Sequence, residues 1–278
     1  MKIAVLSGKG GTGKTFVSVN LAVTAKKSMY IDCDVEEPNG HVFLRPQNIS
    51  EEMISVKKPV FDYEKCIGCR KCVDFCRYGA LVFVKNKPKL FPDICHSCGG
   101  CELICPVKAV SEKDERIGMI QRGEYKKVSV KTGILDPGVP SGVPLIHACV
   151  REEDQDQIMV IDCPPGSACT VIESIEDADF CVIATEPTIF GLHNFKMVQE
   201  LVMILGKPYG VVINKLESFK NPMDQYCIEK HLPLLAHIPF KEELFQSNAE
   251  GLIACEIDDE IAGIFEKMFA RIKNEVTT

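Results

Sequence analysis

The sequence predicts an α/β fold with a doubly wound, mostly parallel sheet that is interrupted by a small inserted module. Three observations lead to this prediction: short aliphatic runs bounded by turn residues, amphipathic stretches between several of them, and a cysteine-rich segment where this alternation stops. Strands buried on both faces of a parallel sheet are nearly continuous apolar runs. The predicted strands are Ile3–Leu6, Met29–Ile31, Ile158–Ile161, Phe180–Ala184, Gly210–Ile213 and Leu234–Ile238. The clearest predicted helices are Lys14–Lys26, Leu192–Leu205 and Asp259–Lys273.

Length and composition limit the classes of protein that the chain can belong to. With 278 residues, 46% of them hydrophobic, it can bury one substantial core and one smaller module. A net charge of -7 gives no basic surface, so nucleic-acid binding is not predicted. No segment approaches the roughly 18 apolar residues that span a bilayer, and Met1 leads directly into a strand pattern. We therefore expect a cytoplasmic protein without membrane attachment.

The cysteines point to a metal-binding module. Eight of the fifteen lie between Cys66 and Cys105, and without a signal peptide they are expected to be ligands and not disulfides. The segment beginning at Cys66 is echoed 29 positions later at Cys95, which indicates a duplicated site. We expect a nucleotide-binding domain at 1–55, the cysteine module at 56–110, and a return segment (Ser111–Val150) with the rest of the main domain at 111–278.

The cysteine spacing is that of bacterial ferredoxins, in which the fourth cysteine of each run binds the other cluster. We therefore expect two [4Fe-4S] clusters. The first ligand set is Cys66, Cys69, Cys72 and Cys105, and the second is Cys76, Cys95, Cys98 and Cys101. Zinc is the alternative, because paired C-x2-C motifs also form sites with four thiolates. Arg77 stands where the ferredoxin pattern has proline, and Arg77 and Lys71 could stabilise a reduced cluster.

A glycine-rich loop between the first predicted strand and helix fits the phosphate-binding pattern G-x-x-x-x-G-K-[ST]. Backbone N–H groups of such a loop surround the β-phosphate, while Lys14 is expected at the β- and γ-phosphates and Thr15 at Mg²⁺. The alternative is a strand-to-helix turn that holds no ligand. The residues of the loop are Gly8, Lys9, Gly10, Gly11, Thr12, Gly13, Lys14 and Thr15.

Lys9, directly after the first glycine, resembles the deviant Walker A lysine of the MinD/ParA family, which also includes Mrp-type carriers, the arsenite-pump ATPase and the nitrogenase iron protein. This resemblance covers residues 1 to about 50 and 155 to 278. It implies an ATPase that forms a homodimer on binding ATP and Mg²⁺, with Lys9 reaching the nucleotide of the partner subunit. Lys9 and Lys14 are then expected to act in catalysis.

Further segments resemble the switches of that family. The segment that ends at Asn39 resembles switch I, in which Asp34 would position or deprotonate the attacking water. The segment from Asp162 to Gly166 resembles switch II, which implies that Asp162 holds Mg²⁺ through water and Gly166 senses the γ-phosphate. An aspartate after a strand is otherwise usually a helix cap or turn former.

The same resemblance assigns an adenine-binding role to Asn214 and to the loop at Pro239, although Asn214 could equally be a turn residue. MinD itself ends in a membrane-binding helix. Here we expect the apolar face of the last helix to cover the sheet, since several glutamates dilute its basic character. That face contains Ile261, Ile264, Phe265, Met268, Phe269 and Ile272.

Together these features predict a dimeric ATPase that couples its nucleotide state to two [4Fe-4S] clusters, for electron delivery to a redox or metallocofactor-assembly partner. Two alternatives stay open: an iron-sulfur cluster carrier or scaffold, and a MinD/ParA-like positioning switch that senses redox state. A further cluster between the subunits would need single cysteines such as Cys149 or Cys163, which we expect to be buried.

Overall fold

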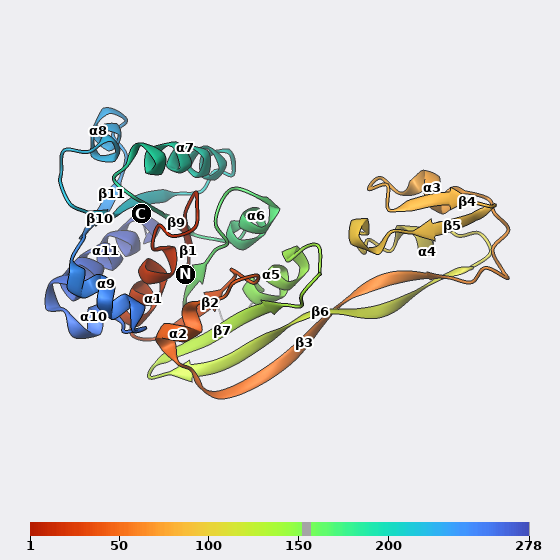
Figure 1. Cartoon of the computed structure of the whole chain (residues 1–278), viewed down its shortest axis with the longest axis horizontal. Helices are drawn as coiled ribbons and strands as arrows, with labels where there is room; N and C mark the ends of the chain where they lie inside the picture. The colour runs from red at the N-terminus through yellow and green to blue at the C-terminus, as the bar shows by residue number, and fades with distance from the viewer. Residues whose placement is uncertain (152–156, 278) are drawn as a thin grey trace.

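The computed structural model describes residues 1–151 and 157–277. They form a nine-stranded sheet in the order β11-β10-β9-β1-β8-β2-β7-β6-β3 (Figure 1). Seven neighbouring strands are parallel, which confirms the predicted doubly wound architecture. These strands are β1 (Lys2–Leu6), β2 (Ser28–Asp32), β7 (Val128–Leu135), β8 (Ile158–Asp162), β9 (Phe180–Thr185), β10 (Tyr209–Leu216) and β11 (Leu234–Pro239).

Helices cover both faces of this sheet, and each face has its own apolar core. One layer consists of α5 (Val143–Val150), α6 (Cys169–Ile175), α7 (Ile189–Ile204) and α8 (Pro222–Glu229). The other consists of α1 (Lys14–Thr24), α2 (Gly40–Leu44), α9 (Glu242–Ala249), α10 (Ala254–Ile257) and α11 (Asp259–Thr277). The sheet is therefore the middle of three layers.

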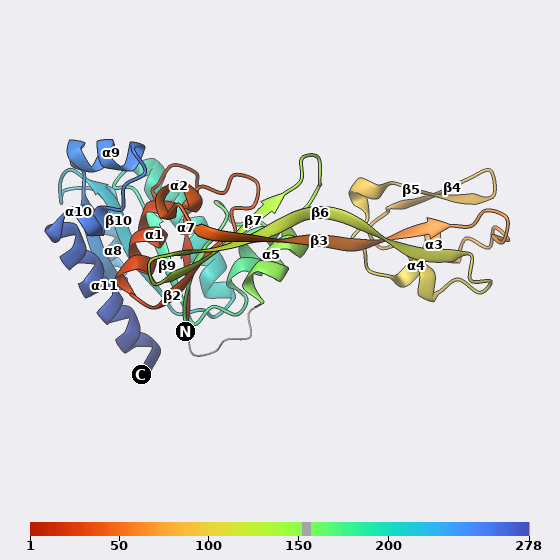
Figure 2. The same cartoon turned by 90° about the horizontal axis from the view of Figure 1, so that it is seen from below.

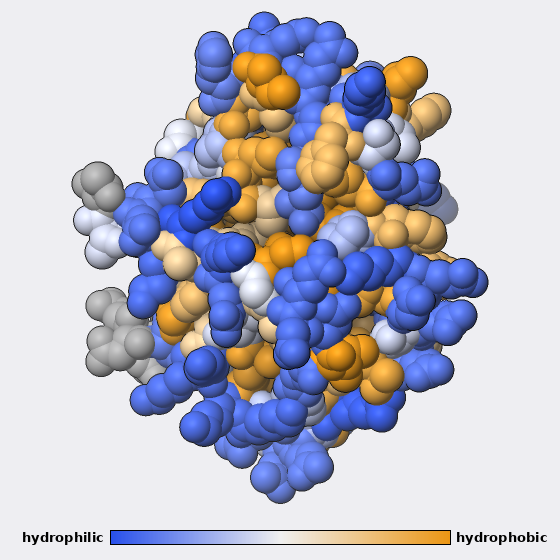
Figure 3. All heavy atoms as spheres, turned by 90° about the vertical axis from the view of Figure 1, so that its left-hand side faces the viewer, coloured by the Kyte–Doolittle hydropathy of each residue, from blue (hydrophilic) through white to orange (hydrophobic). Residues whose placement is uncertain are grey.

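The last helix, α11, lies against the sheet as expected. Ile261, Phe265, Met268 and Ile272 are fully buried in the core, and Phe265 packs against Phe16 of α1. None of the described helices is both long and apolar enough to cross a bilayer. On the side of the molecule at β11, apolar side chains form a band among hydrophilic ones (Figure 3). Exposed residues of α8, α9 and their flanking loops include Phe219, Ile228, Phe240 and Phe245.

Two long antiparallel strands, β3 (Gln47–Phe61) and β6 (Val110–Tyr125), form a ribbon that leaves the sheet. From Gly118 to its end at Tyr125, β6 lies between β7 and β3 and pairs with both. A register shift between Ile54 and Ser55 marks the point beyond which β3 and β6 pair only with each other. The ribbon carries the cysteine module at its tip, away from the body (Figures 1 and 2).

The cysteine module contains two short α-helices, a hairpin and a 3-10 helix. They are α3 (Lys71–Phe75), β4 (Leu81–Val84), β5 (Lys87–Leu90), the 3-10 helix η1 (Pro92–Ile94) and α4 (Gly100–Leu103). The expected boundary at 55/56 falls inside β3, and the one at 110/111 falls at the first residues of β6. The segment Ser111–Val150, expected to be the return path to the main sheet, contains most of β6, all of β7 and α5.

Candidate nucleotide and cluster sites

The phosphate-binding loop connects β1 to α1 and is held between β10 and α7. Gly13, the N-cap of α1, has a φ of 89°, and a Cβ there would lie 2.1 Å from Nδ2 of Asn214. A Cβ on Gly8 would lie 2.3 Å from the backbone oxygen of Asn194. Both positions therefore require glycine, the first for its backbone conformation as well as its size.

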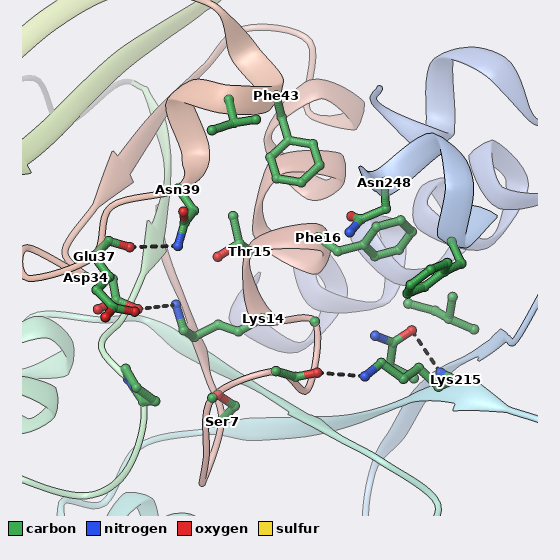
Figure 4. Close-up of a pocket in the computed structure, with 18 of the residues that line it drawn as sticks. Ser7, Lys14, Thr15, Phe16, Asp34, Glu37, Asn39, Phe43, Lys215 and Asn248 are labelled. Atoms are coloured by element: carbon green, nitrogen blue, oxygen red, sulfur yellow. Dashed lines mark hydrogen bonds and ion pairs between the residues drawn. The ribbon is translucent and has the colours of Figure 1, made fainter. Parts of the chain in front are cut away.

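A pocket of about 750 Å³ lies beside this loop at the carboxyl ends of the central strands (Figure 4). Predicted site residues that line it are Gly10, Gly11, Gly13, Lys14, Thr15, Asp34, Asn39, Asn214 and Pro239. Gly8, Lys9, Thr12, Asp162 and Gly166 lie next to it without lining it. The Oγ1 atom of Thr12 is buried and has no hydrogen-bond partner among the described residues. The pocket thus joins the predicted phosphate loop and switch I residues in one cavity.

Lys14 connects the two predicted switches. Its Nζ lies 2.6 Å from Oδ1 of Asp162 and 3.5 Å from Oδ2 of Asp34, and its side chain is only 6% exposed. Burial opposes the charge of Lys14, but the two carboxylates outweigh it and raise its pKa. Burial also raises the pKa of Asp34, and the nearby charge of Lys14 offsets this rise only in part. A bound phosphate would compete with these carboxylates for the Lys14 ammonium.

A buried tyrosine and a second aspartate complete the charged group under the pocket. The Tyr30 hydroxyl donates to Asp162 at 2.8 Å, and Asp32 accepts from the backbone N–H of Gly40 at 2.9 Å. Burial and the nearby Asp162 raise the pKa of Asp32 to about 7. Sequence motifs gave Tyr30 and Asp32 no role, because only the structure shows that Asp32 and Asp162 lie side by side on β2 and β8.

The raised pKa of Asp32 gives a testable pH dependence. Because the folded chain binds this proton more tightly than the unfolded chain, its stabilising contribution is complete below about pH 4 and is lost as the pH rises through about 7. When the pH is raised from about 5.5 to 8, the free energy of unfolding of the wild type should fall by about 1–2 kcal/mol more than that of Asp32→Asn. This corresponds to a few degrees in Tm. Thermal unfolding without nucleotide checks this, with the exposed Asp177→Asn as control. Parallel curves for Asp32→Asn and the wild type would contradict it.

Lys9 is held within its own chain in this structure. Its Nζ lies 2.7 Å from Oε2 of Glu186, whose other oxygen lies 2.8 Å from Nζ of Lys215. Although burial opposes the charge of Glu186, the hydrogen bonds from Lys215 and Lys9 lower its pKa. Lys215 also donates to the backbone oxygen of Gly11 at 2.7 Å. Glu186 therefore connects Lys9, through Lys215, to Gly11 within the phosphate loop, a role that no sequence motif indicated.

The other end of the pocket is more apolar. Asn214 uses its amide to donate to the Thr12 backbone oxygen at 2.8 Å and to accept from the Lys215 N–H at 2.9 Å. Pro239 lies near it in the pocket wall. Residues from α1, α2 and α9 that no motif identified also line this cavity: Phe16, Phe43 and Asn248, which Figure 4 labels, and Phe245. An aromatic and amide lining is suited to a flat heterocycle.

The structure brings together both predicted cysteine sets. One small cavity of the module is lined by Cys66, Cys69, Cys72 and Cys105, and another by Cys76, Cys95, Cys98 and Cys101. Cys72 contributes to the lining of both. Among the described residues, no three His, Cys, Asp or Glu side chains converge on a position for a single metal ion. Four thiols around each cavity, with the crossed fourth cysteine, fit the ligand set of a [4Fe-4S] cluster.

The two cysteine loops have the same backbone form. Gly68 and Ser97, which are equivalent in the repeat, have φ values of 69° and 55°. The next equivalent pair, Arg70 and Gly99, has φ values of 63° and 72°. Each loop then continues into a short helix, α3 or α4. The sequence duplication therefore corresponds to a structural one, in which left-handed residues turn the chain around each cavity.

The cysteines outside the module are mostly buried. Cys33, Cys149 and Cys163 are fully buried between the sheet and α5, and burial raises the pKa of Cys33 and of Cys163 well above the usual value. In this conformation neither Cys149 nor Cys163 is presented to a second subunit.

The fold and the pocket together define the class of protein. The main part of the sheet is parallel, a glycine-rich loop follows β1, and a lysine stands at the start of α1. Aspartates stand at the ends of β2 and β8. These features define a P-loop nucleotide-binding site.

Comparison with known proteins identifies the family. Residues 3–254 match the family described as the CobQ/CobB/MinD/ParA nucleotide binding domain, and the chain belongs to this family. Among solved structures, MinD of Pyrococcus horikoshii in complex with Mg-ADP has a TM-score of 0.63 and 18% identity, covering 98% of this chain and 95% of MinD. At this identity the likeness concerns the fold.

Sequence relatives cover both parts of the chain. The uncharacterized protein MJ0579 of Methanocaldococcus jannaschii is 29% identical over 82% of this chain and 88% of its own length. The iron-sulfur cluster carrier protein of the same organism is 22% identical over 99% of this chain and 84% of its own length. The pyruvate synthase subunit PorD of Methanothermobacter marburgensis is 37% identical over 59 residues, which are 21% of this chain and 69% of PorD. Ferredoxins show similar short matches.

Proposed function

We propose that this protein is a dimeric ATPase that couples its nucleotide state to two [4Fe-4S] clusters and delivers electrons to a redox or metallocofactor-assembly partner. The observation that carries the proposal is the ribbon: one continuous pair of strands joins the nucleotide-binding domain to the module with both cysteine cavities. In the proposed complex Lys14 and Thr15 bind the phosphates and Mg²⁺, Asp162 holds Mg²⁺ through water, and Asp34 orients the attacking water.

Backbone contacts link the predicted switch I to the ribbon. The N–H of Leu135, at the end of β7, donates to the Val35 oxygen at 2.9 Å. The next residue, Asp136, donates to the oxygen of Ile117 in β6 at 2.9 Å, and its side chain pairs with Arg116 at 2.8 Å. Val35 directly follows Asp34, so a nucleotide-dependent change in that segment would act on the base of the ribbon.

The proposed ligand sets are the two groups of four cysteines described above. When bound, such clusters supply one-electron transfer, and the protein holds them by thiolates on separate loops. Complete four-cysteine sets favour electron transfer over cluster delivery, because a cluster to be handed over should be held more loosely.

A redox titration with and without nucleotide tests the proposal. We expect MgATP to shift the cluster potentials, measured by EPR under anaerobic conditions, by about 60 mV or more, which is roughly 1.4 kcal/mol per electron. The Lys9→Ala variant, in which ATP-dependent closure is lost, should show no shift. Equal potentials with and without MgATP in the wild type would contradict coupling.

A cluster carrier is the second candidate, because the iron-sulfur cluster carrier protein of Methanocaldococcus jannaschii aligns with 99% of this chain. It predicts transfer of iron and sulfide to an apo-ferredoxin, accelerated by MgATP, with unchanged potentials. The electron-transfer proposal instead predicts that the chain keeps its iron through repeated reduction and oxidation.

A further inference from the structure

Lys58 is a buried lysine at the tip of the ribbon. It belongs to β3, its side chain is only 6% exposed, and its Nζ donates to the backbone oxygens of Cys95 at 2.8 Å and Pro92 at 3.1 Å. Both acceptors belong to the loop of the second cysteine set, although Lys58 precedes the first set in the chain. A charge this well buried is costly unless it has hydrogen-bond partners, so its placement on this loop is specific.

Lys87 makes the equivalent contact on the other loop. It lies on β5, between the two sets in sequence, and its Nζ lies 2.6 Å from the backbone oxygens of both Cys66 and Tyr63. The two contacts correspond residue by residue: Lys87 to Lys58, Tyr63 to Pro92, and Cys66 to Cys95. The positions differ by the 29 residues of the cysteine repeat, and each lysine precedes a proline. Each half of the repeat therefore sends one lysine to the cysteine loop of the other half.

Neither lysine is neutralised by an acidic side chain. Within the described part of the chain, Lys58 and Lys87 form hydrogen bonds to carbonyl oxygens and no ion pair. No carboxylate of a described residue is therefore within ion-pair distance to offset the charge of either ammonium beside Cys95 or Cys66, the first cysteines of the two runs. Lys58 is the more deeply buried of the two, so solvent and salt screen it less.

We propose that Lys58 and Lys87 are positioning residues that fix the first cysteine of each run, Cys95 and Cys66, and by their charge make the cluster held there easier to reduce. This rests on the proposed cluster ligation. Reduction adds negative charge within the cysteine loop, and a nearby cation stabilises that added charge. Lys58 acts on the set that contains Cys95, and Lys87 acts on the set that contains Cys66.

The test uses the full-length protein, loaded with iron and sulfide under anaerobic conditions, and Lys58→Met and Lys87→Met variants. At a fixed applied potential, we expect Lys58→Met to lower the ratio of reduced to oxidised Cys95-set cluster about tenfold, which is 59 mV for one electron. Lys87→Met should lower this ratio for the other cluster, by a smaller factor. Lys89→Met, an exposed lysine on β5, should change neither. Repeating the titration in a Cys69→Ser background assigns each signal to its set.

Lys58→Gln separates charge from hydrogen bonding, because glutamine can still donate to a carbonyl but is neutral. It should lower the ratio as Lys58→Met does. If both Lys58 variants contain the full amount of iron and have the same cluster potentials as the wild type, the proposal is overturned. Loss of iron from both, with full iron in Lys89→Met, would show a purely structural role and also overturn it. Failure of the wild type to bind iron would instead reject the cluster ligation itself.

Discussion

Lys9→Ala should abolish ATP hydrolysis while leaving nucleotide binding to the single chain nearly intact. We expect kcat to fall at least about 10³-fold, as for the loss of an arginine finger, with MgADP affinity within about threefold of the wild type. The physical reason is the position of Lys9: it pairs with Glu186 at 2.7 Å, does not line the pocket of its own chain, and is 37% exposed. In the proposed dimer it would serve the nucleotide of the second subunit. Steady-state ATPase rates and calorimetric ADP titrations measure the two effects.

Mixing two inactive variants tests whether Lys9 acts across the dimer. Lys14→Met removes the phosphate-binding lysine but leaves Lys9 in place, so a mixed dimer with Lys9→Ala has one complete site. An equal mixture should regain up to about a quarter of the wild-type rate, since half of the dimers are mixed and each has one working site. Lys9→Arg, which keeps the charge, serves as the conservative control. An inactive mixture of chains that do form dimers would show that Lys9 acts within its own subunit.

The second large effect concerns the crossed cysteines. The wild type should bind about eight iron atoms per chain, and a Cys69→Ser, Cys105→Ser double variant should keep about four, because both residues belong to one proposed set. A Cys69→Ser, Cys76→Ser double variant should lose nearly all iron, because it damages both sets. Iron analysis and the cluster absorbance measure this, with Cys255→Ser, outside the module, as control.

The opposite pattern would contradict the crossed pairing. If each run of four cysteines held its own cluster, the double variant at Cys69 and Cys76 would keep one cluster. The double variant at Cys69 and Cys105 would lose both. The cavity that contains Cys105 together with Cys66, Cys69 and Cys72 supports the crossed arrangement. Binding of about two metal ions per chain, with zinc in place of iron, would support the zinc alternative.

The central part of the fold could be predicted from the sequence because it is buried. The six predicted strands all belong to the parallel sheet, and burial on both faces makes each a run of apolar residues. The seventh parallel strand, β7, escaped detection because it contains a buried lysine, Lys131, and Gly133, which interrupt its apolar pattern.

The ribbon could not be predicted for the opposite reason. From Lys57 and Asp114 to the tip, no residue of β3 or β6 belongs to either apolar core of the main domain, so charged residues can occupy both faces of the ribbon. Such a strand has no hydrophobic period. The phosphate loop and cysteine runs, in contrast, could be located because their chemistry demands fixed spacing. Phe245 and Asn248 of the pocket carry no such spacing and became visible only when α9 was placed beside the phosphate loop.

The unsupported part of the ribbon also limits how the two ends of the molecule can influence each other. Seven residue pairs, from Ser55 opposite Arg116 to Phe61 opposite Val110, extend beyond the sheet, and at about 3.3 Å per residue they span roughly 20 Å. The screening length in physiological salt is about 8 Å, so the electric field of the phosphates has decayed almost completely at the tip. Under the proposed function, ATP would therefore act on the cysteine module mechanically, by changing the angle at which the ribbon leaves the sheet. A small rotation at that base would move the module by a distance proportional to the length of the arm and change the surroundings of its cysteine loops. Under the proposed coupling, both the cluster potentials and the encounter with a partner would then follow the nucleotide state.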